Sequence, residues 1–353
     1  MNENSQNVVG ADDGYGDFKY ANGLIGHIPS FVIPFVPKPK EDFTEGGKSK
    51  LQYIASEIDN QKYVVGDYAV KLSPNISWSG GERKHEDKRF PILFKTALGF
   101  MTKGNREVID LLMMNLPIRY DTPDRRFTLE SIAKGKHEVN ISLDGVSFVR
   151  KSIIVEAVDI KKQPFGSLCD VILNNDGDMM EPDIAKGFNV VVDIGARTLN
   201  ILTLEALEEQ PELTIQTNDG MYAAYTQIGK YLENELGVII PDGKLPQIIL
   251  DKEIKGRDIE PLIKAAYENH ANAILSVLDK LLINSFGFVT SIIFTGGGSE
   301  ILRPYLERAF KNVNTIFLHR YANVKGLRKY GIRQAKKNSN RISVRVGSSD
   351  YRH

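Results

Sequence analysis

The sequence has very little cysteine and histidine, which excludes two common ways of stabilising a fold. Cys169 is the only cysteine, so the chain cannot form an internal disulfide, and we expect this thiol to be a small buried core residue. The six histidines are scattered, and no His/Cys pair has the spacing of a zinc site. We therefore expect no metal site built from side chains alone, and the reducing cytoplasm is the expected location.

Net charge and long apolar runs are also lacking. Lysine and arginine together number 45, as do aspartate and glutamate, so no net charge favours direct binding to nucleic acid or to a membrane surface. The longest apolar runs, such as FNVVVDI at 188–194, are strand-sized and too short to span a bilayer. Residues 1–7 lack the basic and apolar regions of a signal peptide. The length of 353 residues predicts two domains.

What the sequence does contain is one pattern that occurs twice: a buried strand, a tight turn carrying Asp-x-Gly, and a returning strand. The first copy is VGADDGYGDFKY at 9–20, with Asp12 at its turn. The second is VVDIGARTLN at 191–200, with Asp193 at its turn. Apolar strands that alternate with glycine turns and helical segments predict a mixed α/β fold. Two similar units of this kind would face each other across a cleft.

The remaining segments give a coarse map of helices and loops. The clearest helix is expected over 258–286, where Pro261 fits the first turn. A strand, a triple-glycine turn and a helix are expected over 291–310. Four other segments are expected as an exposed loop at 37–50, a charged and solvated stretch at 77–90, a turn entering a helix at 159–170, and a mobile or late-docking tail from Arg333.

The chemistry of the two hairpin turns suits phosphate together with a divalent cation. A glycine turn lets backbone N–H groups approach phosphate oxygens without a Cβ between them. An aspartate beside that turn repels phosphate unless a cation intervenes, and Mg²⁺ commonly bridges carboxylates and nucleotide phosphates. Lys19, at the exit of the first hairpin, offers a point charge to the phosphates. The backbone of FTGGGSEI at 294–301 can lie against a flat ligand, with a helix N-terminus behind it.

Two other nucleotide-binding motifs fail in this sequence. The segment EGGKSK contains GKS at 47–49, but Asp42 stands where the Walker pattern requires its first glycine. The dinucleotide fingerprint fails in the first hairpin, because Lys19 occupies the place of its third glycine. It fails again in the triple-glycine segment, where Ile301 occupies that place. Both ordinary nucleotide folds are therefore disfavoured.

In their order and spacing, these motifs resemble the actin, sugar-kinase and heat-shock-chaperone ATPase superfamily. The similar segments are GADDGYGDFK, DIKKQPFGSL, VVDIGARTLNI, IIFTGGGSEIL and YANVKGLRKYG, which span nearly the whole chain. Within the superfamily, the chain looks most like plasmid-segregating bacterial actins of the ParM type and their archaeal relatives. The resemblance implies an actin-like (ribonuclease-H-like) two-domain α/β fold with nucleotide in the interdomain cleft. Domain I would comprise 1–164 and 322–353, and domain II 165–321.

The resemblance also implies a role for each motif residue. Asp12 would hold hydrated Mg²⁺, and Asp193 would act on that metal through water and order the attacking water. Gln163 would orient the same water, while Asn323 and Lys325 belong to the second connecting segment. The implied cofactors are ATP or GTP with Mg²⁺. The residues expected around the nucleotide are Asp12, Gly14, Tyr15, Gly16, Lys19, Gly195, Ala196, Arg197, Thr198, Gly296, Gly297, Gly298 and Ser299.

Three residues depart from the family pattern. Tyr15 stands where a small hydroxyl residue is usual, so a side-chain bond to the γ-phosphate is lost or replaced. Arg197 stands where glycine or threonine is more common, and Asn200 replaces an aspartate. These changes bear on nucleotide preference and on hydrolysis rate more than on the fold.

The implied function is that of a filament-forming ATPase. Nucleotide closes the cleft, subunits polymerise head to tail, and hydrolysis weakens the filament to drive plasmid DNA segregation. The expected partners are further copies of the chain and a DNA-binding adaptor on a plasmid centromere, with no membrane and no direct nucleic acid contact. The alternative is a small-molecule kinase acting on a sugar or an acid, in which Asp159 could serve as the base.

Overall fold

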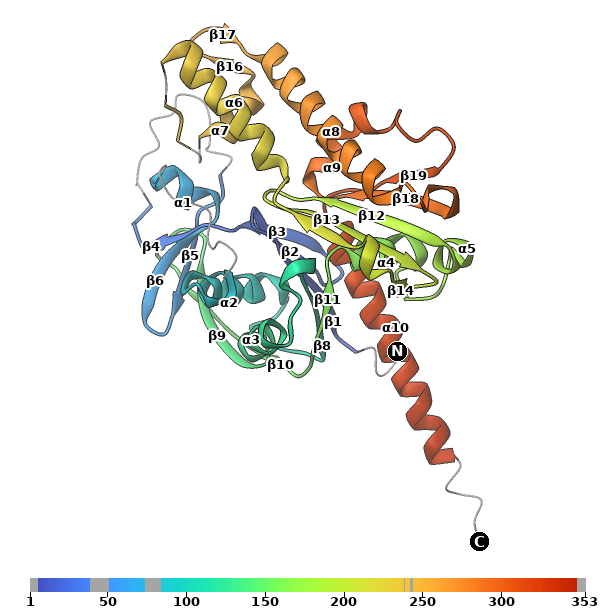
Figure 1. Cartoon of the computed structure of the whole chain (residues 1–353). Helices are drawn as coiled ribbons and strands as arrows, with labels where there is room; N and C mark the ends of the chain where they lie inside the picture. Colours follow the sequence, from blue (N-terminus) through green and yellow to red (C-terminus); the bar gives the residue numbers. More distant parts are fainter. Residues whose placement is uncertain (1–5, 39–50, 74–83, 238, 242–243, 348–353) are drawn as a thin grey trace.

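The computed structural model describes residues 6–38, 51–73, 84–237, 239–241 and 244–347. Figure 1 shows two groups of sheets and helices, and the long C-terminal helix runs past both. Each group mixes strands with helices, which confirms the predicted α/β class. None of the helices in these ranges is long and apolar enough to cross a membrane.

The first sheet contains the first predicted hairpin. Strand β1 (Val8–Asp13) pairs antiparallel with β2 (Asp17–Ala21), which pairs antiparallel with the edge strand β3 (Ile25–Pro29). On its other side β1 pairs in parallel with β8 (Leu111–Leu116), and β8 pairs in parallel with β11 (Val158–Lys162). Every residue of β1 is buried, as expected for a central strand covered on both faces.

The third sheet repeats this arrangement. Strand β12 (Phe188–Ile194) pairs antiparallel with β13 (Leu199–Glu205) and in parallel with β18 (Val289–Thr295), which pairs in parallel with β19 (Asn314–Phe317). The order β13-β12-β18-β19 therefore reproduces the order β2-β1-β8-β11, and this confirms the predicted duplication. The strands that also pair with β13 are β14 (Glu208–Glu209) and β15 (Ile215–Thr217).

The other strands form a second sheet and a short ribbon. The second sheet has the order β4-β6-β5-β9-β10-β7 and belongs to the same half of the chain as the first. Its strands are β4 (Val32–Pro34), β5 (Ile54–Ile58), β6 (Gln61–Val65), β7 (Arg106–Ile109), β9 (Gly135–Ser142) and β10 (Val149–Val155). The ribbon consists of β16 (Glu253–Ile254) and β17 (Arg257–Asp258).

Helices cover the sheets and complete two main hydrophobic cores. Helix α2 (Arg89–Met101) packs against strands of the first and second sheets, whereas α8 (Glu260–Leu282) and α9 (Gly297–Leu306) complete the core of the third (Figure 1). Pro261 lies in the first turn of α8, as predicted. The other helices are α1 (Asp67–Leu72), α3 (Pro123–Ala133), α4 (Phe165–Ile172), α5 (Pro182–Lys186), α6 (Met221–Leu236), α7 (Leu245–Asp251) and α10 (Ala322–Gly347), and the short 3-10 helices are η1 (Lys84–Glu86), η2 (Ile118–Tyr120), η3 (Pro211–Leu213) and η4 (Phe286–Phe288).

Helix α10 connects the two halves through close backbone contacts. It packs both against β1 of the first sheet and against α4 of the second half. A Cβ added to Gly326 would lie 1.7 Å from the carbonyl oxygen of Gly166, and one added to Gly10 would lie 2.2 Å from that of Val324. Only glycine permits helices and strands to approach this closely.

The tail from Arg333, expected to be a mobile or late-docking end, is helical, and Arg333 donates to the carbonyl oxygen of Gly177 at 3.1 Å. Helix α10 continues to Gly347, and its first half is anchored on α4. The ammonium group of Lys329 lies 2.6 Å from a carboxylate oxygen of Asp170, and the ring of Tyr330 packs edge-on against Phe165. The polar tail is therefore the continuation of a helix whose first turns pack on α4.

Two loop predictions are also corrected. Residues 159–162 extend strand β11, because parallel pairing with β8 engages their backbone before the turn at Gln163. Lys84, in the stretch expected to be solvated, is only 5% exposed. The rest of the predicted loops, at 39–50 and 77–83, lies outside the described residues. Cys169 is buried in the core around α4, as predicted.

Candidate functional site

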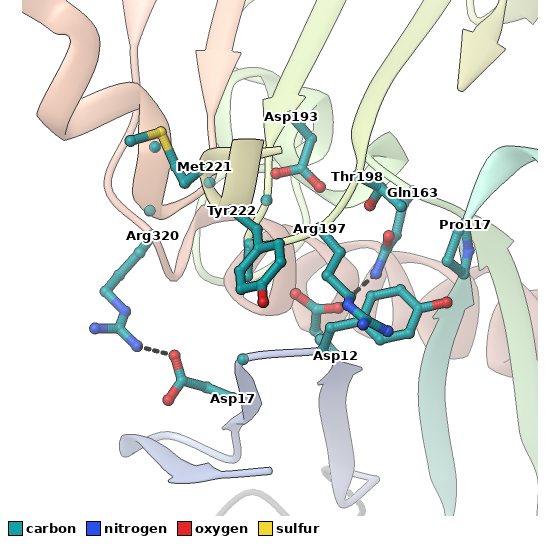
Figure 2. A pocket seen from close by; sticks show the side chains of 18 of the residues that line it. Asp12, Asp17, Pro117, Gln163, Asp193, Arg197, Thr198, Met221, Tyr222 and Arg320 are labelled. Atoms are coloured by element: carbon teal, nitrogen blue, oxygen red, sulfur yellow. Dashed lines mark hydrogen bonds and ion pairs between the residues drawn. The ribbon is translucent and has the colours of Figure 1, made fainter. Parts of the chain in front are cut away.

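A cavity of about 470 Å³ lies between the first and third sheets, where both hairpins meet (Figure 2). This volume is within the usual range for small-molecule sites. Its lining comes from both halves of the chain, as the predicted cleft requires. The predicted site residues that line it are Asp12, Gly14, Tyr15, Gly16, Lys19, Gln163, Asp193, Gly195, Ala196, Arg197, Thr198, Gly296, Gly297 and Gly298.

The carboxyl ends of three parallel strands position the polar groups of the first half. Asp12, near the end of β1, lies opposite Lys19 on β2, and the Lys19 ammonium group is 3.6 Å from an Asp12 carboxylate oxygen. The amide of Gln163 donates from Nε2 to Asp12 Oδ1 at 2.8 Å (Figure 2) and to Oδ1 of Asn115 at 3.0 Å. A carboxylate can only accept, so the Gln163 amide is oriented by Asp12. Both charged and neutral groups thus converge at one sheet edge.

Asp193 faces this cluster from the second hairpin. Burial raises the pKa of its carboxyl to about 7, and the negative charge of Asp12 adds to this effect, while Lys19 opposes it. A glycine must follow β18 here, because Gly296 has φ +86° and a Cβ on it would lie 2.3 Å from Asp193 Oδ1. The carboxylates of Asp12 and Asp193, with Lys19 as the neighbouring lysine, form a site with excess negative charge.

We predict that Asp193→Asn stabilises the protein when nucleotide and metal are absent, and more so at high pH. The folded-state pKa of about 7 lies above the ordinary value of 3.8, so the ionised carboxylate destabilises the fold. That destabilisation grows as pH rises from 3.8 toward 7 and is complete above 7. The melting temperature in a chelating buffer should therefore exceed that of the wild type by a margin that widens between pH 5.5 and 8. A margin that is constant across this range would contradict the prediction.

The loop of the second hairpin is braced by the start of α6. The backbone N–H groups of Met221 and Tyr222 donate to the carbonyl oxygens of Gly195 and Ala196 at 3.0 and 2.8 Å. The N–H of Gly195 donates across the turn to the carbonyl of Thr198 at 3.0 Å. These hydrogen bonds fix the backbone conformation of the loop where it lines the cavity.

The triple-glycine segment lies where α9 begins. A Cβ on Gly297 would meet no atom within 4 Å, so this residue faces open space in the cavity wall. Ser299 differs from the prediction, because it is fully buried and does not line the cavity. Its hydroxyl donates to the carbonyl oxygens of Gly296 at 2.9 Å and of Leu318 at 3.2 Å. Ser299 therefore supports the glycine loop from behind.

A buried charge cluster at the first hairpin has no motif in the sequence that would indicate it. The ammonium group of Lys84 lies 3.7 Å from Asp13 Oδ2 and donates to the carbonyl of Gly14 at 2.8 Å. His85 Nε2 contacts the same carboxylate at 2.5 Å. Burial by itself would raise the pKa of Asp13, but Lys84 and His85 together lower it below its ordinary value. Both residues also line the cavity.

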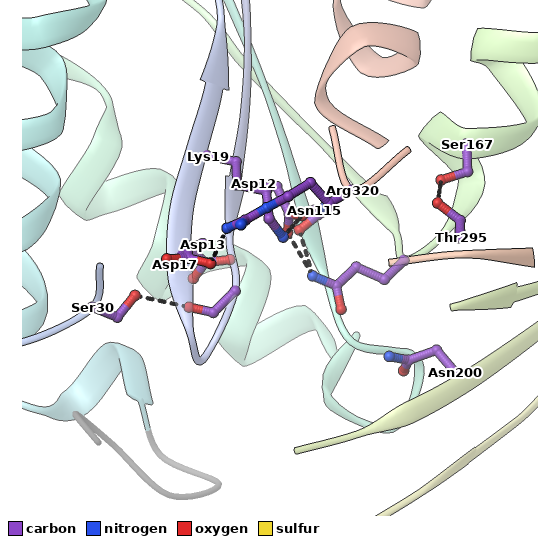
Figure 3. Close-up of polar contacts among 12 residues, drawn as sticks. Asp12, Asp13, Asp17, Lys19, Ser30, Asn115, Ser167, Asn200, Thr295 and Arg320 are labelled. Atoms are coloured by element: carbon purple, nitrogen blue, oxygen red, sulfur yellow. Dashed lines mark hydrogen bonds and ion pairs between the residues drawn. The ribbon is translucent and has the colours of Figure 1, made fainter. Parts of the chain in front are cut away.

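A second missed contact closes the other side of the cavity. Arg320, in the loop that precedes α10, forms an ion pair with Asp17 of the first hairpin (Figures 2 and 3). Further lining residues that no motif indicated are Pro117, Tyr120, Arg125, Met221, Tyr222, Tyr225 and Pro246. They come from α6 and from segments of the chain that lie outside the quoted motifs.

Other predicted residues lie beside the cavity. Asn200 donates from Nδ2 to Thr198 Oγ1 at 3.2 Å and so supports the second hairpin. The Asn323 side chain is buried near Gly166, and Lys325 pairs with Asp170 at 3.1 Å. Neither of the latter two lines the cavity, so their contribution is to the contact between α10 and α4.

Comparisons with known proteins agree with this geometry. Residues 10–166 match the family described as the N-terminal domain of actin-like proteins, and residues 191–308 match the C-terminal domain of archaeal MreB-like actin homologues. An archaeal actin homolog of Thermoplasma acidophilum is 24% identical over 311 residues, which cover 85% of this chain and 90% of that protein. The chain belongs to the actin-like superfamily.

Solved structures of actin-like proteins share the fold. A subunit of a 15-stranded ParM filament from Clostridium botulinum has a TM-score of 0.75 at 18% identity, covering 93% of this chain and 99% of its own. An archaeal actin homolog in complex with ADP has a TM-score of 0.69 at 19% identity, covering 94% and 99%. The actin-like, ParM-similar fold predicted from the motifs is thereby confirmed.

The residues of this actin-like cavity fit a hydrated magnesium ion. The described residues contain no group of three or more His, Cys, Asp or Glu side chains that could hold a metal directly. Two carboxylates facing a cavity suit Mg²⁺, which retains waters and takes further ligands from phosphates. Asn115 also points to an additional hydrogen-bonding group, because its buried Nδ2 has no partner within the described part of the chain. A buried ordered water would satisfy this donor.

Proposed function

We propose that this actin-like protein binds a Mg-nucleotide between its two hairpins, polymerises head to tail and hydrolyses ATP. The observation that carries the proposal is the convergence of Asp12, Asp193 and the glycine segment 296–298 on one cavity. An archaeal actin homolog of the same fold was crystallised with ADP, which supports a nucleotide here. The ParM filament of the same fold supports self-assembly.

Each site residue has a specific role in the proposed reaction. Asp12 and Asp193 would hold the hydrated magnesium through its waters, and Lys19 would contact the phosphates. Bound Mg²⁺ supplies neutralisation of the phosphate charge. Gln163, whose amide nitrogen bonds to Asp12, would accept a hydrogen bond from the attacking water through its amide oxygen. Alignment of water by a glutamine suits slow hydrolysis coupled to assembly.

The glycine segment completes the site at the other end of the nucleotide. Gly296, Gly297 and Gly298 would lie along the adenosine, because the absence of side chains at these positions allows close approach. The proposed nucleotide is ATP or GTP. The proposed division of the chain is a domain I of 1–164 and 322–353 and a domain II of 165–321, with the cavity between them.

The proposed biological role is plasmid DNA segregation in the cytoplasm. The chain carries 45 basic and 45 acidic side chains, so it has no excess positive charge for direct binding to DNA. A DNA-binding adaptor on a plasmid centromere would therefore link the filament to its cargo. The alternative, a sugar or acid kinase, has less support, because Asp159 accepts a hydrogen bond from Gln334 at 3.0 Å and does not line the cavity.

Light scattering of the purified protein tests the proposal. We expect scattering to rise when Mg-ATP is added and to decay as phosphate is released, with filaments visible by electron microscopy. Mg-ADP at the same concentration is the control and should give a smaller or shorter-lived rise. The absence of filaments at any concentration, together with ATP turnover stimulated by a sugar or an acid, would favour the kinase alternative.

A further inference from the structure

Arg197 and Tyr15, two residues that depart from the family pattern, meet across the cavity. The guanidinium carbon of Arg197 lies 5.7 Å from the centroid of the Tyr15 ring, although the two belong to different hairpins. Figure 2 shows Arg197 extending from the second hairpin toward the side of the cavity that carries Asp12. Tyr15 lies at the turn of the first hairpin, where the phosphates are expected. The guanidinium group is therefore placed at the phosphate end of the cavity.

The Tyr15 ring is a fixed platform for this cation. The ammonium group of Lys84 lies 5.5 Å from the ring centroid, and Lys84 is itself bonded to the carbonyl of Gly14. Burial raises the pKa of the Tyr15 hydroxyl, so the side chain stays neutral. Cations on a buried aromatic ring are attracted to its electron-rich face, and such a contact is compatible with N–H···O bonds from the same guanidinium group.

The charges of the first hairpin are largely balanced within the protein. Lys19 pairs with Asp12, and Lys84 pairs with Asp13. A nucleoside triphosphate brings one more phosphate group to this site than a diphosphate does. A guanidinium group can bind phosphate oxygens in a bidentate manner, and charge-assisted hydrogen bonds of this kind are among the stronger ones in proteins.

We propose that Arg197 binds the terminal phosphate of a nucleoside triphosphate and makes the cavity select triphosphate over diphosphate, with Tyr15 as its positioning residue. This inference rests on the proposed function, since it assumes a nucleotide in the cavity. The phosphate contact that a small hydroxyl residue at position 15 would provide is then supplied from position 197. The aromatic ring of Tyr15 holds Arg197, which supplies the phosphate contact in place of the small hydroxyl residue.

Equilibrium binding of two nucleotides separates this role from a merely structural one. Wild type and variants are titrated in Mg²⁺ with ADP and with a non-hydrolysable ATP analogue. We expect Arg197→Ala to weaken binding of the analogue by at least about tenfold and that of ADP by less than about threefold. Arg197→Lys keeps the charge but not the planar fork, so its loss should be intermediate. Tyr15→Phe keeps the aromatic ring and should retain the preference for the triphosphate analogue over ADP, whereas Tyr15→Leu should lose part of that preference.

Arg303→Ala is the matched control. The guanidinium carbon of Arg303 lies 5.2 Å from the Phe317 ring centroid, outside the cavity, so its removal should change neither affinity. Equal weakening of both nucleotides by Arg197→Ala would overturn the inference and leave Arg197 as a brace between the hairpins. Failure of the wild type to bind either nucleotide would instead overturn the proposed function. A melting curve for each variant verifies that it is folded.

Discussion

Replacement of Asp193 by alanine should lower the rate of phosphate release from ATP by at least about a hundredfold. Asp193 faces Asp12 across the cavity and is the proposed group that orders the metal-bound and attacking waters. Its loss removes a charge that the reaction needs, while the glycine segment that would hold the nucleotide is untouched. If filament decay depends on hydrolysis, light scattering should persist long after wild-type filaments have disassembled.

The measurement is phosphate release at saturating Mg-ATP, with ADP binding measured on the same preparation. Asp279→Ala is the control, because Asp279 is an exposed aspartate on α8, remote from the cavity lining. This control should hydrolyse ATP at the wild-type rate. Phosphate release by Asp193→Ala within about threefold of wild type would remove Asp193 from the mechanism, since the loss of a positioned charge in an active site has far larger effects.

The second large effect is expected on stability. Lys84→Met should lower the free energy of unfolding by about 3 kcal/mol, because it leaves the buried carboxylate of Asp13 without its lysine partner. The Lys84 and Asp13 side chains are only 6% and 2% exposed, so water cannot replace the lost interaction. The variant also removes the hydrogen bond to the carbonyl of Gly14, so the first hairpin should bind nucleotide less tightly.

Urea denaturation of a double-mutant cycle provides the test. Lys84→Met combined with Asp13→Asn should recover part of the lost stability, because the carboxylate charge is removed along with its partner. The matched control is Lys264→Met, which breaks an exposed ion pair with Glu260 and should cost less than about 1 kcal/mol. Equal destabilisation by the buried and exposed lysine substitutions would show that the Lys84 pair contributes no more than a surface contact.

The sequence predicted those parts of the site that local patterns encode. Each hairpin combines an apolar strand, an aspartate and a glycine turn within about a dozen residues, and this combination identifies both the strand and its chemistry. The parallel pairing of β8 with both β1 and β11 then brings Gln163 to Asp12, although they are 151 residues apart. The order of the motifs, through the resemblance, was sufficient to predict this meeting.

Other parts depend on long-range contacts that no local pattern shows. The segment around Lys84 is rich in charge and has the composition of a solvated loop, yet its lysine is buried because Asp13 compensates its charge from 71 positions away. Helix α10 has few apolar residues beyond Tyr330, so its helical continuation could not be inferred from hydrophobic periodicity. Ser299 follows three glycines, but only the tertiary structure shows that its hydroxyl turns away from the cavity.

The glycine contacts of α10 restrict how the two halves can move relative to each other. Gly326 lies against Gly166 of α4, and Gly10 of β1 lies against Val324, so the same short stretch of helix is held by both halves. These contacts resist separation of the two halves, and the ion pair of Lys329 with Asp170 fixes the helix to the second half. Gly347 lies about 32 Å along the helix axis from Gly326, so a rotation of about 10° would displace it by about 6 Å. A rotation of one half relative to the other is therefore largest, as a displacement, at the end of this helix.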